Sequence, residues 1–357
     1  MNQSTPEKTL KARIADLIRT DGPISLSVFM QLALYDRTQG YYATRPGVGQ
    51  DFTTAPEVSQ VFGELLGLWV VNEWRQLGAP NSFNLVELGP GRGVMMADIW
   101  RATAGVSGFQ SAANLILIDP SPALRTIQAE RLKDANPVWA DSLDEIDDKP
   151  SIILGNEVLD CLPIRQLVCR DKEWRERLVG LDDHGDLQLG LSPAPVQDPP
   201  NIVQDTAEIS PALEALIEEV ARKLTNSTGR ALFIDYGPAK AVPGDTLRAY
   251  KRGQQVDPIT SPGETDLTAD VDFSAVKRLS VVHGLDVAGP TPQGHFLAAL
   301  GGEARVNALI SANPSDTDEL IKGAMRIMAP EEMGERFKAI CLSSPNLHAP
   351  AGFSVFS

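Results

Sequence analysis

Four short apolar segments, separated by helical patterns and turns, constrain the fold of this chain more than any other feature. The segments end at Glu87, at Asp119, at Asn156 with Glu157, and at Asp235. Apolar strands that alternate with helices are typical of an open, mostly parallel α/β sheet. Because ligands bind at the carboxyl ends of the strands in such sheets, we expect these polar residues to line a binding site.

The rest of the chain surrounds this predicted sheet with helices and insertions. With 357 residues it is long for one compact domain and short for three. Helical patterns, with Ser25 as an expected cap, predict an N-terminal helical region with a lid loop over 1–80. Ser121 is the expected cap of the helix that follows the second apolar strand. A domain over 81–357 follows, with insertions at about 164–230 and about 238–300. The first insertion begins with a hairpin pattern that turns at Asp182–Gly185.

The turn after the first apolar strand predicts a ligand that comes close to the backbone. Gly89, Gly91 and Gly93 follow Glu87 at alternate positions, and glycine permits positive φ without a side chain in the way. A dinucleotide fold needs G-x-G-x-x-G, but Val94 stands where its third glycine would fall. An acid at the strand end favours an ammonium group over a diphosphate. S-adenosylmethionine, which carries an ammonium, a sulfonium and a ribose but no phosphate, fits this pattern.

Two later positions extend the predicted cofactor site. Asp119, at the end of the second strand, can accept hydrogen bonds from both ribose hydroxyls. Asp141 and Ser142 follow a further short strand, which lies between the second and third apolar segments, and we expect them to face the adenine. Each position also has a plain structural interpretation. The glycines can form only a tight turn, Asp119 can be a helix cap or a surface acid, and Asp141 can be purely structural.

Composition excludes several classes of function. The net charge of −15 argues against a nucleic-acid groove, although it suits a basic protein substrate as well as simple solubility. Three cysteines without a CxxC pair indicate a reducing compartment, and we expect a cytoplasmic protein without a secretory signal or membrane span. We expect no metal, because the His, Cys and acidic residues lack metal-ligand spacing. No GxSxG elbow for a hydrolase is present.

Seven motifs distributed over most of the chain resemble the MidA family of methyltransferases. They are FMQLALYDRTQGYY (29–42), DFTTAPEVSQVFGELLG (51–67), VELGPGRGVMMADI (86–99), GNEVLDCLPIRQ (155–166), FIDYG (233–237), SPGETDLTADVDF (261–273) and TPQGHFLAALG (291–301). The resemblance implies a Rossmann-like class I methyltransferase fold with helices on both faces of the sheet, and S-adenosylmethionine-dependent methylation of a protein. Mitochondrial members act in complex I assembly by methylating an arginine, so the resemblance implies a complex I (NADH dehydrogenase) subunit as substrate.

Arginine methylation would place carboxylates around the target guanidinium, because they can orient it bidentately. We expect Glu157 first and Asp160 second in this role, beside Asn156, with Asp235 and Tyr236 as neighbours. An acidic segment with Asp266, Asp270 and Asp272 is expected either to cover the same cleft or to form loops and caps. The loop Gly40–Glu57, which holds Tyr41 and Tyr42, is expected to be a lid over the cofactor.

The sequence departs from the family in one loop and leaves other functions open. Family members carry a His shortly before the Pro-Gly-x-x-Asp-Leu-Thr motif, whereas this chain has QQVDPI (254–259), so a catalytic His there is in doubt. His295 lies within a family motif, but a structural role is the simpler interpretation. Alternatives are a non-catalytic assembly chaperone that keeps the cofactor fold and a small-molecule methyltransferase; an oxidoreductase is the weakest. The oligomeric state does not follow from the sequence.

Overall fold

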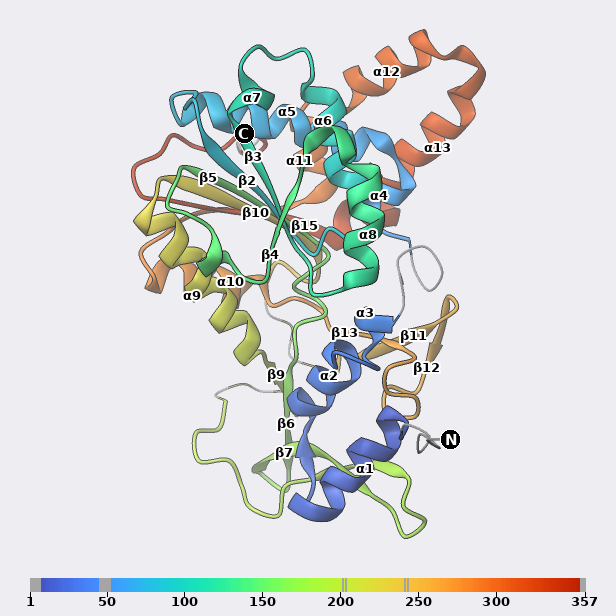
Figure 1. The fold of residues 1–357 in the computed structure, drawn as a ribbon. Coiled ribbons are helices and arrows are strands. Elements are labelled where there is room, and N and C mark those ends of the chain that lie inside the picture. Colours follow the sequence, from blue (N-terminus) through green and yellow to red (C-terminus); the bar gives the residue numbers. More distant parts are fainter. Residues whose placement is uncertain are drawn as a thin grey trace, which may run out of the picture. The chain divides into compact units, whose positions relative to one another are not determined.

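A computed structural model describes residues 8–44, 53–200, 202, 204–240, 242 and 244–353. The chain divides into two compact units (Figure 1). The small unit contains Met1–Phe52, Cys161–Ala212 and Val242–Ala269, and the large unit contains Thr53–Asp160, Leu213–Ala241 and Asp270–Ser357. Each unit has segments that lie far apart in the sequence, so the chain passes between the units several times.

A seven-stranded sheet in the order β14-β15-β10-β5-β2-β3-β4 organises the large unit. Its strands are β2 (Phe83–Leu88), β3 (Ala113–Ile118), β4 (Val138–Ala140), β5 (Ser151–Asn156), β10 (Gly229–Tyr236), β14 (Asp286–Pro292) and β15 (Phe337–Ser343). The pairs from β4 to β10 are parallel, and β15 runs antiparallel to both of its neighbours. The four apolar segments of the sequence therefore form the centre of one sheet, as predicted.

Helices cover both faces of this sheet, which confirms the predicted class I methyltransferase-like α/β fold. Helices α9 and α10 lie on one side, and α6 and α8 lie on the other (Figure 1). The α-helices of the unit are α4 (Ala55–Val58), α5 (Gln60–Gln76), α6 (Val94–Thr103), α7 (Phe109–Ala112), α8 (Pro122–Arg131), α9 (Pro211–Asn226), α10 (Phe273–Val282), α11 (Gln293–Ala299), α12 (Gly302–Ala312) and α13 (Thr317–Met328). Short 3-10 or π turns are η1 (Lys133–Ala135), η2 (Leu143–Glu145), η3 (Pro314–Asp316) and η4 (Pro330–Gly334).

The small unit combines two antiparallel sheets with N-terminal helices. One sheet has the order β1-β7-β6-β9 with β8 paired to β7, and the other has the order β12-β11-β13. Its elements are α1 (Leu10–Asp21), β1 (Ile24–Ser25), α2 (Leu26–Tyr35), α3 (Tyr41–Thr44), β6 (Arg165–Arg170), β7 (Glu173–Leu181), β8 (Leu187–Leu191), β9 (Thr206–Ile209), β11 (Arg248–Lys251), β12 (Gln254–Val256) and β13 (Asp266–Thr268). The expected turn at Asp182–Gly185 joins β7 to β8 and is closed by a hydrogen bond from Gly185 N to Asp182 O.

The division into units differs from the domain boundaries expected from the sequence. Residues 53–80 belong to the large unit, because α5 packs against α6; a Cβ on Gly63 would lie 2.5 Å from the Asp98 Cβ. The expected insertion at 238–300 is also divided: residues 242–269 lie in the small unit, whereas β14 pairs with β15 in the large sheet. A boundary based on composition does not detect such contacts between distant segments.

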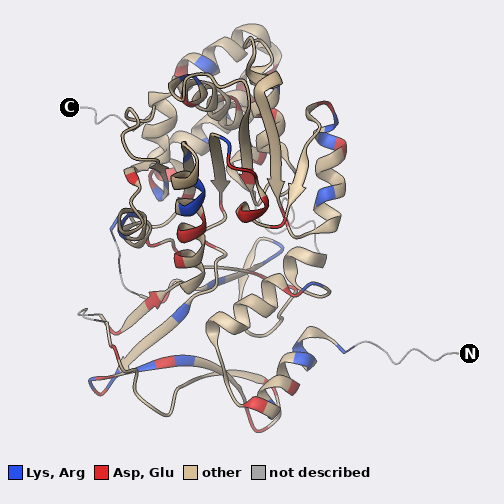
Figure 2. Cartoon of the chain, turned by 60° about the vertical axis from the view of Figure 1, so that its left-hand side comes forward, with Lys and Arg blue, Asp and Glu red and all other residues tan. Residues whose placement is uncertain are grey.

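Acidic and basic residues are distributed over both units of the chain. In the view of Figure 2, the basic residues of the described chain are scattered among acidic ones. Within the described ranges, none of the helices combines the length and apolar character needed to cross a membrane.

Candidate functional site

The glycine turn, residues Gly89–Gly93, connects β2 to α6 at the carboxyl edge of the sheet. Gly89, Gly91 and Gly93 have φ angles of 59°, 52° and 74°, in the left-handed region that residues with a Cβ rarely adopt. Gly93 is the N-cap of α6, so the turn delivers the chain directly into the first turn of a helix. The backbone of these residues, rather than their side chains, is what the turn presents.

Gly89 has a second role, because its missing side chain makes room for the loop that follows β5. A Cβ on Gly89 would lie 2.7 Å from Val158 Cγ1, and a Cβ on Gly155 would lie 2.9 Å from Val158 Cγ2. Both distances are shorter than any normal contact, so these two glycines make room for Val158. The glycine turn and the loop after β5 are therefore packed side by side.

Glu87 is a buried carboxyl group with an unused acceptor. Its side chain is 3% exposed, and burial, with a further contribution from the Asp119 carboxylate, raises the pKa of Glu87 to about 8. Among the described residues, Glu87 Oε2 has no hydrogen-bond partner. A buried carboxylate without a partner is costly, so this position suits a cationic ligand group that would supply the missing donors.

Asp119 follows β3 and is held in a fixed orientation. Its Oδ1 accepts from Ser121 N at 2.8 Å, and its Oδ2 accepts from Gln128 Nε2 at 2.8 Å. Burial raises the pKa of Asp119, and the Ser121 and Gln128 hydrogen bonds oppose this shift. The expected helix cap is the neighbouring Ser121, whose hydroxyl accepts from Leu124 N, so Asp119 itself does not cap α8.

Asp141 and Ser142 follow β4, as expected, but Asp141 points outward. Its side chain is 76% exposed and forms an ion pair with Arg125 at 2.5 Å. Ser142 begins a loop that α9 holds in place: Glu219 accepts from Leu143 N at 2.6 Å, and Arg222 pairs with Asp144 at 2.9 Å.

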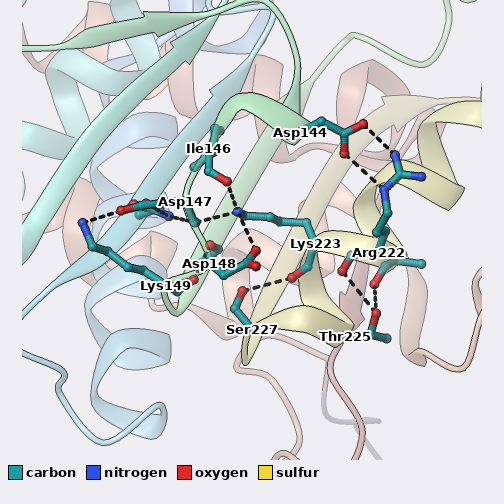
Figure 3. A network of polar contacts seen from close by, with 12 residues as sticks. Asp144, Ile146, Asp147, Asp148, Lys149, Arg222, Lys223, Thr225 and Ser227 are labelled. Carbon is teal, nitrogen blue, oxygen red and sulfur yellow. Dashed lines mark hydrogen bonds and ion pairs between the residues drawn. The ribbon is translucent and has the colours of Figure 1, made fainter.

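Further along this loop, the buried Lys223 donates to Ile146 O, Asp147 O and Asp148 Oδ1 (Figure 3). These residues line a hollow of about 210 Å³ whose charges are already paired in the structure. The residues around this hollow therefore hold the loop in place, and the hollow offers no separate binding site.

The end of β5 carries the strongest sequence-predicted catalytic candidate in an unusual backbone conformation. Glu157 has a φ of 54°, which costs a residue with a Cβ of the order of 1 kcal/mol. Its Oε1 accepts from Ala55 N at 3.2 Å and from Asn156 Nδ2 at 3.1 Å. Among the described residues, Asn156 Oδ1 has no partner. A strained residue at the end of a strand, whose carboxylate is held by hydrogen bonds, is a candidate for function.

Asp235 supports this loop from the neighbouring strand. It is fully buried; its Oδ2 accepts from Leu159 N at 2.8 Å and Asp160 N at 3.3 Å, and its Oδ1 accepts from Tyr236 N at 2.8 Å. Burial, together with the nearby Asp160 and Glu157 carboxylates, raises the pKa of Asp235. The structure thus brings Glu157, Asp160 and Asp235 together, and it gives Asp235 a bonding role toward the backbone.

The described parts of the expected lid lie in different units. Residues 45–52, which include Asp51 and Phe52, lie outside the described residues. Tyr41 is fully buried in the core of the small unit, and the Tyr42 hydroxyl donates to Asp266 at 2.9 Å. In the large unit, Glu57 of α4 pairs with Arg92 of the glycine turn. A lid role therefore stays a prediction, but the segment at Glu57 is attached to the glycine turn.

The acidic segment has structural partners at each of its three positions. Asp266 is 2% exposed and accepts from Tyr42, Asp270 pairs with Arg336 at 3.0 Å, and Asp272 caps α10 by accepting from Ala275 N at 3.0 Å. These contacts match the loop-and-cap interpretation. Over the described ranges, no group of three His, Cys, Asp or Glu residues has the arrangement of a metal site.

Comparison with known proteins agrees with the class of protein that this fold and site define. Residues 65–291 match the model of a family described as "putative S-adenosyl-L-methionine-dependent methyltransferase". The chain belongs to this family of S-adenosylmethionine-dependent methyltransferases, as the motifs of the sequence predict.

The chain is also similar to curated relatives and to a solved structure over nearly its whole length. Protein arginine methyltransferase NDUFAF7 of Danio rerio is 34% identical over 94% of this chain and 87% of its own length, and the Drosophila melanogaster homologue is 32% identical over 94% and 84%. A Burkholderia thailandensis protein, whose crystal structure contains S-adenosylhomocysteine, has a TM-score of 0.85 and 26% identity. That alignment covers 98% of this chain and 95% of the Burkholderia chain.

The geometry at the glycine turn fits the cofactor of this family. The ends of the neighbouring strands β2 and β3 carry three features that can bind it. They are a backbone turn with three positive φ angles, the buried carboxylate of Glu87 with an unpartnered oxygen, and the fixed carboxylate of Asp119. The cofactor has one cationic amino group and a ribose with two hydroxyls, which are the groups that such acceptors bind. S-adenosylmethionine is therefore the cofactor of this protein.

Proposed function

We propose that this protein is an arginine N-methyltransferase that modifies a subunit of respiratory complex I during its assembly. The observation that carries the proposal is the cluster of Glu157, Asp160 and Asp235 at the ends of β5 and β10. A guanidinium is a planar cation with five N–H donors, and carboxylates bind it better than any other side chain does. The names of the curated relatives, protein arginine methyltransferase NDUFAF7, support the same substrate class.

The residues have distinct roles in this proposal. Glu87 accepts hydrogen bonds from the ammonium of the cofactor, Asp119 accepts from the ribose hydroxyls, and the loop from Asp141 to Ser142 borders the adenine. When bound, S-adenosylmethionine supplies an electrophilic methyl group on its sulfonium. The glycine turn binds through its backbone, which has positive φ angles at Gly89, Gly91 and Gly93.

On the substrate side, Glu157 orients the target guanidinium and Asp160 adds negative charge. Asn156 and Ala55 hold the Glu157 carboxylate, and Asp235 holds the backbone of Leu159 and Asp160. Because the orienting groups are fixed before the substrate arrives, little reorganisation is needed at the moment of transfer.

We also assign the enzyme to a bacterial cytoplasm. The cysteines Cys161, Cys169 and Cys341 form no disulfide among the described residues, which agrees with a reducing compartment.

A labelling experiment tests the substrate class. The purified protein is incubated with methyl-labelled S-adenosylmethionine and, separately, with each isolated complex I subunit of the same organism. We expect label in one subunit, recovered as methylarginine after acid hydrolysis. Glu157→Gln should abolish the label while S-adenosylhomocysteine still binds, because we propose that this residue acts on the substrate and not on the cofactor.

Other results would favour other functions. A subunit that binds the protein but acquires no label would indicate an assembly chaperone. Label in a small-molecule fraction, with none in any subunit, would indicate a small-molecule methyltransferase. Label recovered as methyllysine would contradict the arginine assignment while leaving the cofactor site in place.

A further inference from the structure

Helix α8 carries a fully buried glutamine in the middle of an otherwise apolar stripe. Leu124 and Gln128 are four residues apart on one helical face, and Leu132 follows at the C-cap. All three are buried, and Gln128 is 0% exposed. Burying an amide is costly unless its polar atoms are bonded, so an aliphatic residue would be the cheaper choice for packing alone.

The amide of Gln128 connects three segments of the predicted cofactor site. Its Nε2 donates to Gly91 O at 2.8 Å and to Asp119 Oδ2 at 2.8 Å. Its Oε1 accepts from Trp139 Nε1, also at 2.8 Å. These partners follow β2, follow β3 and lie within β4, so a single side chain joins three neighbouring strands at the edge of the sheet.

The Gln128 side chain also packs against the glycine turn. A Cβ on Gly93 would lie 3.6 Å from Gln128 Cγ and 3.4 Å from Leu132 Cδ1, which are ordinary contacts. The buried face of α8 therefore packs against the glycine turn, and the Gln128 amide is the polar group on that face.

We propose that Gln128 is a positioning residue that sets cofactor affinity and ribose selectivity by locking Asp119 to the glycine turn. The inference rests on the proposed roles of Asp119 and the turn. Ser121 N holds one oxygen of Asp119 and Gln128 holds the other, so the plane of the carboxylate is fixed. Each oxygen keeps a second lone-pair direction for a ribose hydroxyl. Without Gln128, the carboxylate can turn, and Gly91 O loses its partner.

Calorimetric titration of Gln128→Leu tests the proposal. The ligands are S-adenosylhomocysteine and its 2′-deoxyribose analogue, which lacks one hydroxyl that Asp119 is proposed to bind. Gln293→Leu is the matched control, because Gln293 is equally buried and also donates to a main-chain carbonyl, Ile327 O at 2.7 Å. It lies on α11, which packs against β14 and β15 at the other edge of the sheet.

We expect the wild type to prefer the ribose ligand by about 10-fold, the effect of one hydrogen bond to a charged group. Gln128→Leu should bind S-adenosylhomocysteine about 10-fold more weakly and lose most of that preference, whereas Gln293→Leu should keep both within about 2-fold. A purely structural role would lower the thermal midpoint but leave the preference between the two ligands unchanged.

Two outcomes overturn the inference in different ways. If Gln128→Leu retains the wild-type preference, Gln128 does not position Asp119, while the cofactor site itself stands. If the wild type binds neither ligand, the cofactor assignment falls and the inference falls with it. Should Gln128→Leu fail to fold, Trp139→Phe removes the donor that orients the Gln128 amide and should reduce the same preference; an unchanged preference would again overturn the inference.

Discussion

Two buried acids at the carboxyl edge of the sheet, Glu87 on β2 and Asp235 on β10, differ in how their oxygens are used. Both are almost inaccessible to solvent, and burial raises the pKa of each. Asp235 accepts three main-chain N–H groups, from Leu159, Asp160 and Tyr236. Glu87 Oε2, in contrast, has no partner among the described residues.

We interpret this difference as separating an acid that maintains the fold from one that we propose to bind a ligand. Burial and a raised pKa alone would rank Glu87 and Asp235 alike as functional candidates. The hydrogen bonds distinguish them, because a satisfied carboxylate contributes to its own loop, whereas an unsatisfied one lowers stability until a cation arrives. We therefore expect substitutions at the two positions to have opposite signatures in stability and in binding.

The largest expected effect is on stability, at Asp235. Asp235→Leu should lower the free energy of unfolding by about 3 kcal/mol or more, because three buried N–H groups lose their acceptors. Asp235→Asn, which keeps one acceptor oxygen, should lose less. Urea denaturation followed by circular dichroism measures both. If the leucine variant is as stable as the wild type, Asp235 does not maintain the loop after β5.

Glu87 should show the opposite signature. Glu87→Gln should weaken S-adenosylhomocysteine binding by about 10- to 100-fold, since a charge-assisted hydrogen bond is lost, while the fold keeps its stability or gains some. A gain is expected above about pH 8, where the wild-type carboxyl group is ionised, because a neutral amide costs less to bury than an unpartnered carboxylate. Titration calorimetry and urea denaturation of the same preparation provide both numbers. Unchanged affinity with a large loss of stability would remove the contrast with Asp235.

The pH dependence of binding sharpens the same contrast. The raised pKa of Glu87, about 8, means that below this pH the ligand-free protein holds a proton on the carboxyl group. A cationic amino group binds the ionised form, so the proton must leave. Affinity for S-adenosylhomocysteine should therefore rise with pH, by about fivefold between about pH 7 and pH 8 and by about a further twofold above, where it levels off. Glu87→Gln is the control and should flatten this profile; a flat wild-type profile would contradict the assignment.

The strand ends are predictable from the sequence because they depend on local pattern. Buried parallel strands consist of continuous apolar residues, and a turn that needs positive φ selects glycine, so local pattern alone places Glu87, Asp119 and Asp235 at the edge of the sheet. The fold class, which follows from the same pattern, is confirmed. The caps at Ser25 and Ser121 are also confirmed, because a cap depends on residues only about three positions apart.

What the sequence does not reveal depends on contacts between distant segments. Gln128 gives one signal, a polar residue in the apolar stripe of α8, but its partners Gly91 and Trp139 lie 37 and 11 residues away. The need for Gly89 to accommodate Val158, and the assignment of residues 53–80 to the large unit, likewise arise from tertiary packing. The cofactor and substrate roles of the site residues stay predictions until binding and labelling are measured.

The smallest expected effect concerns the link between Glu57 of α4 and Arg92 of the glycine turn. The side chains are 12% and 36% exposed, so solvent screens the pair, and the hydrogen bond to Glu57 raises the pKa of Arg92. In a double-mutant cycle with Glu57→Gln and Arg92→Gln, we expect a coupling energy of about 0.5–1 kcal/mol in unfolding.

The same double-mutant cycle, measured with and without S-adenosylhomocysteine, distinguishes two roles of this ion pair. Equal coupling with and without ligand would mean that the pair only attaches α4 to the turn. Coupling that grows with ligand would mean that α4 closes on the cofactor end of the site, on the side of Glu87 rather than that of Asp235.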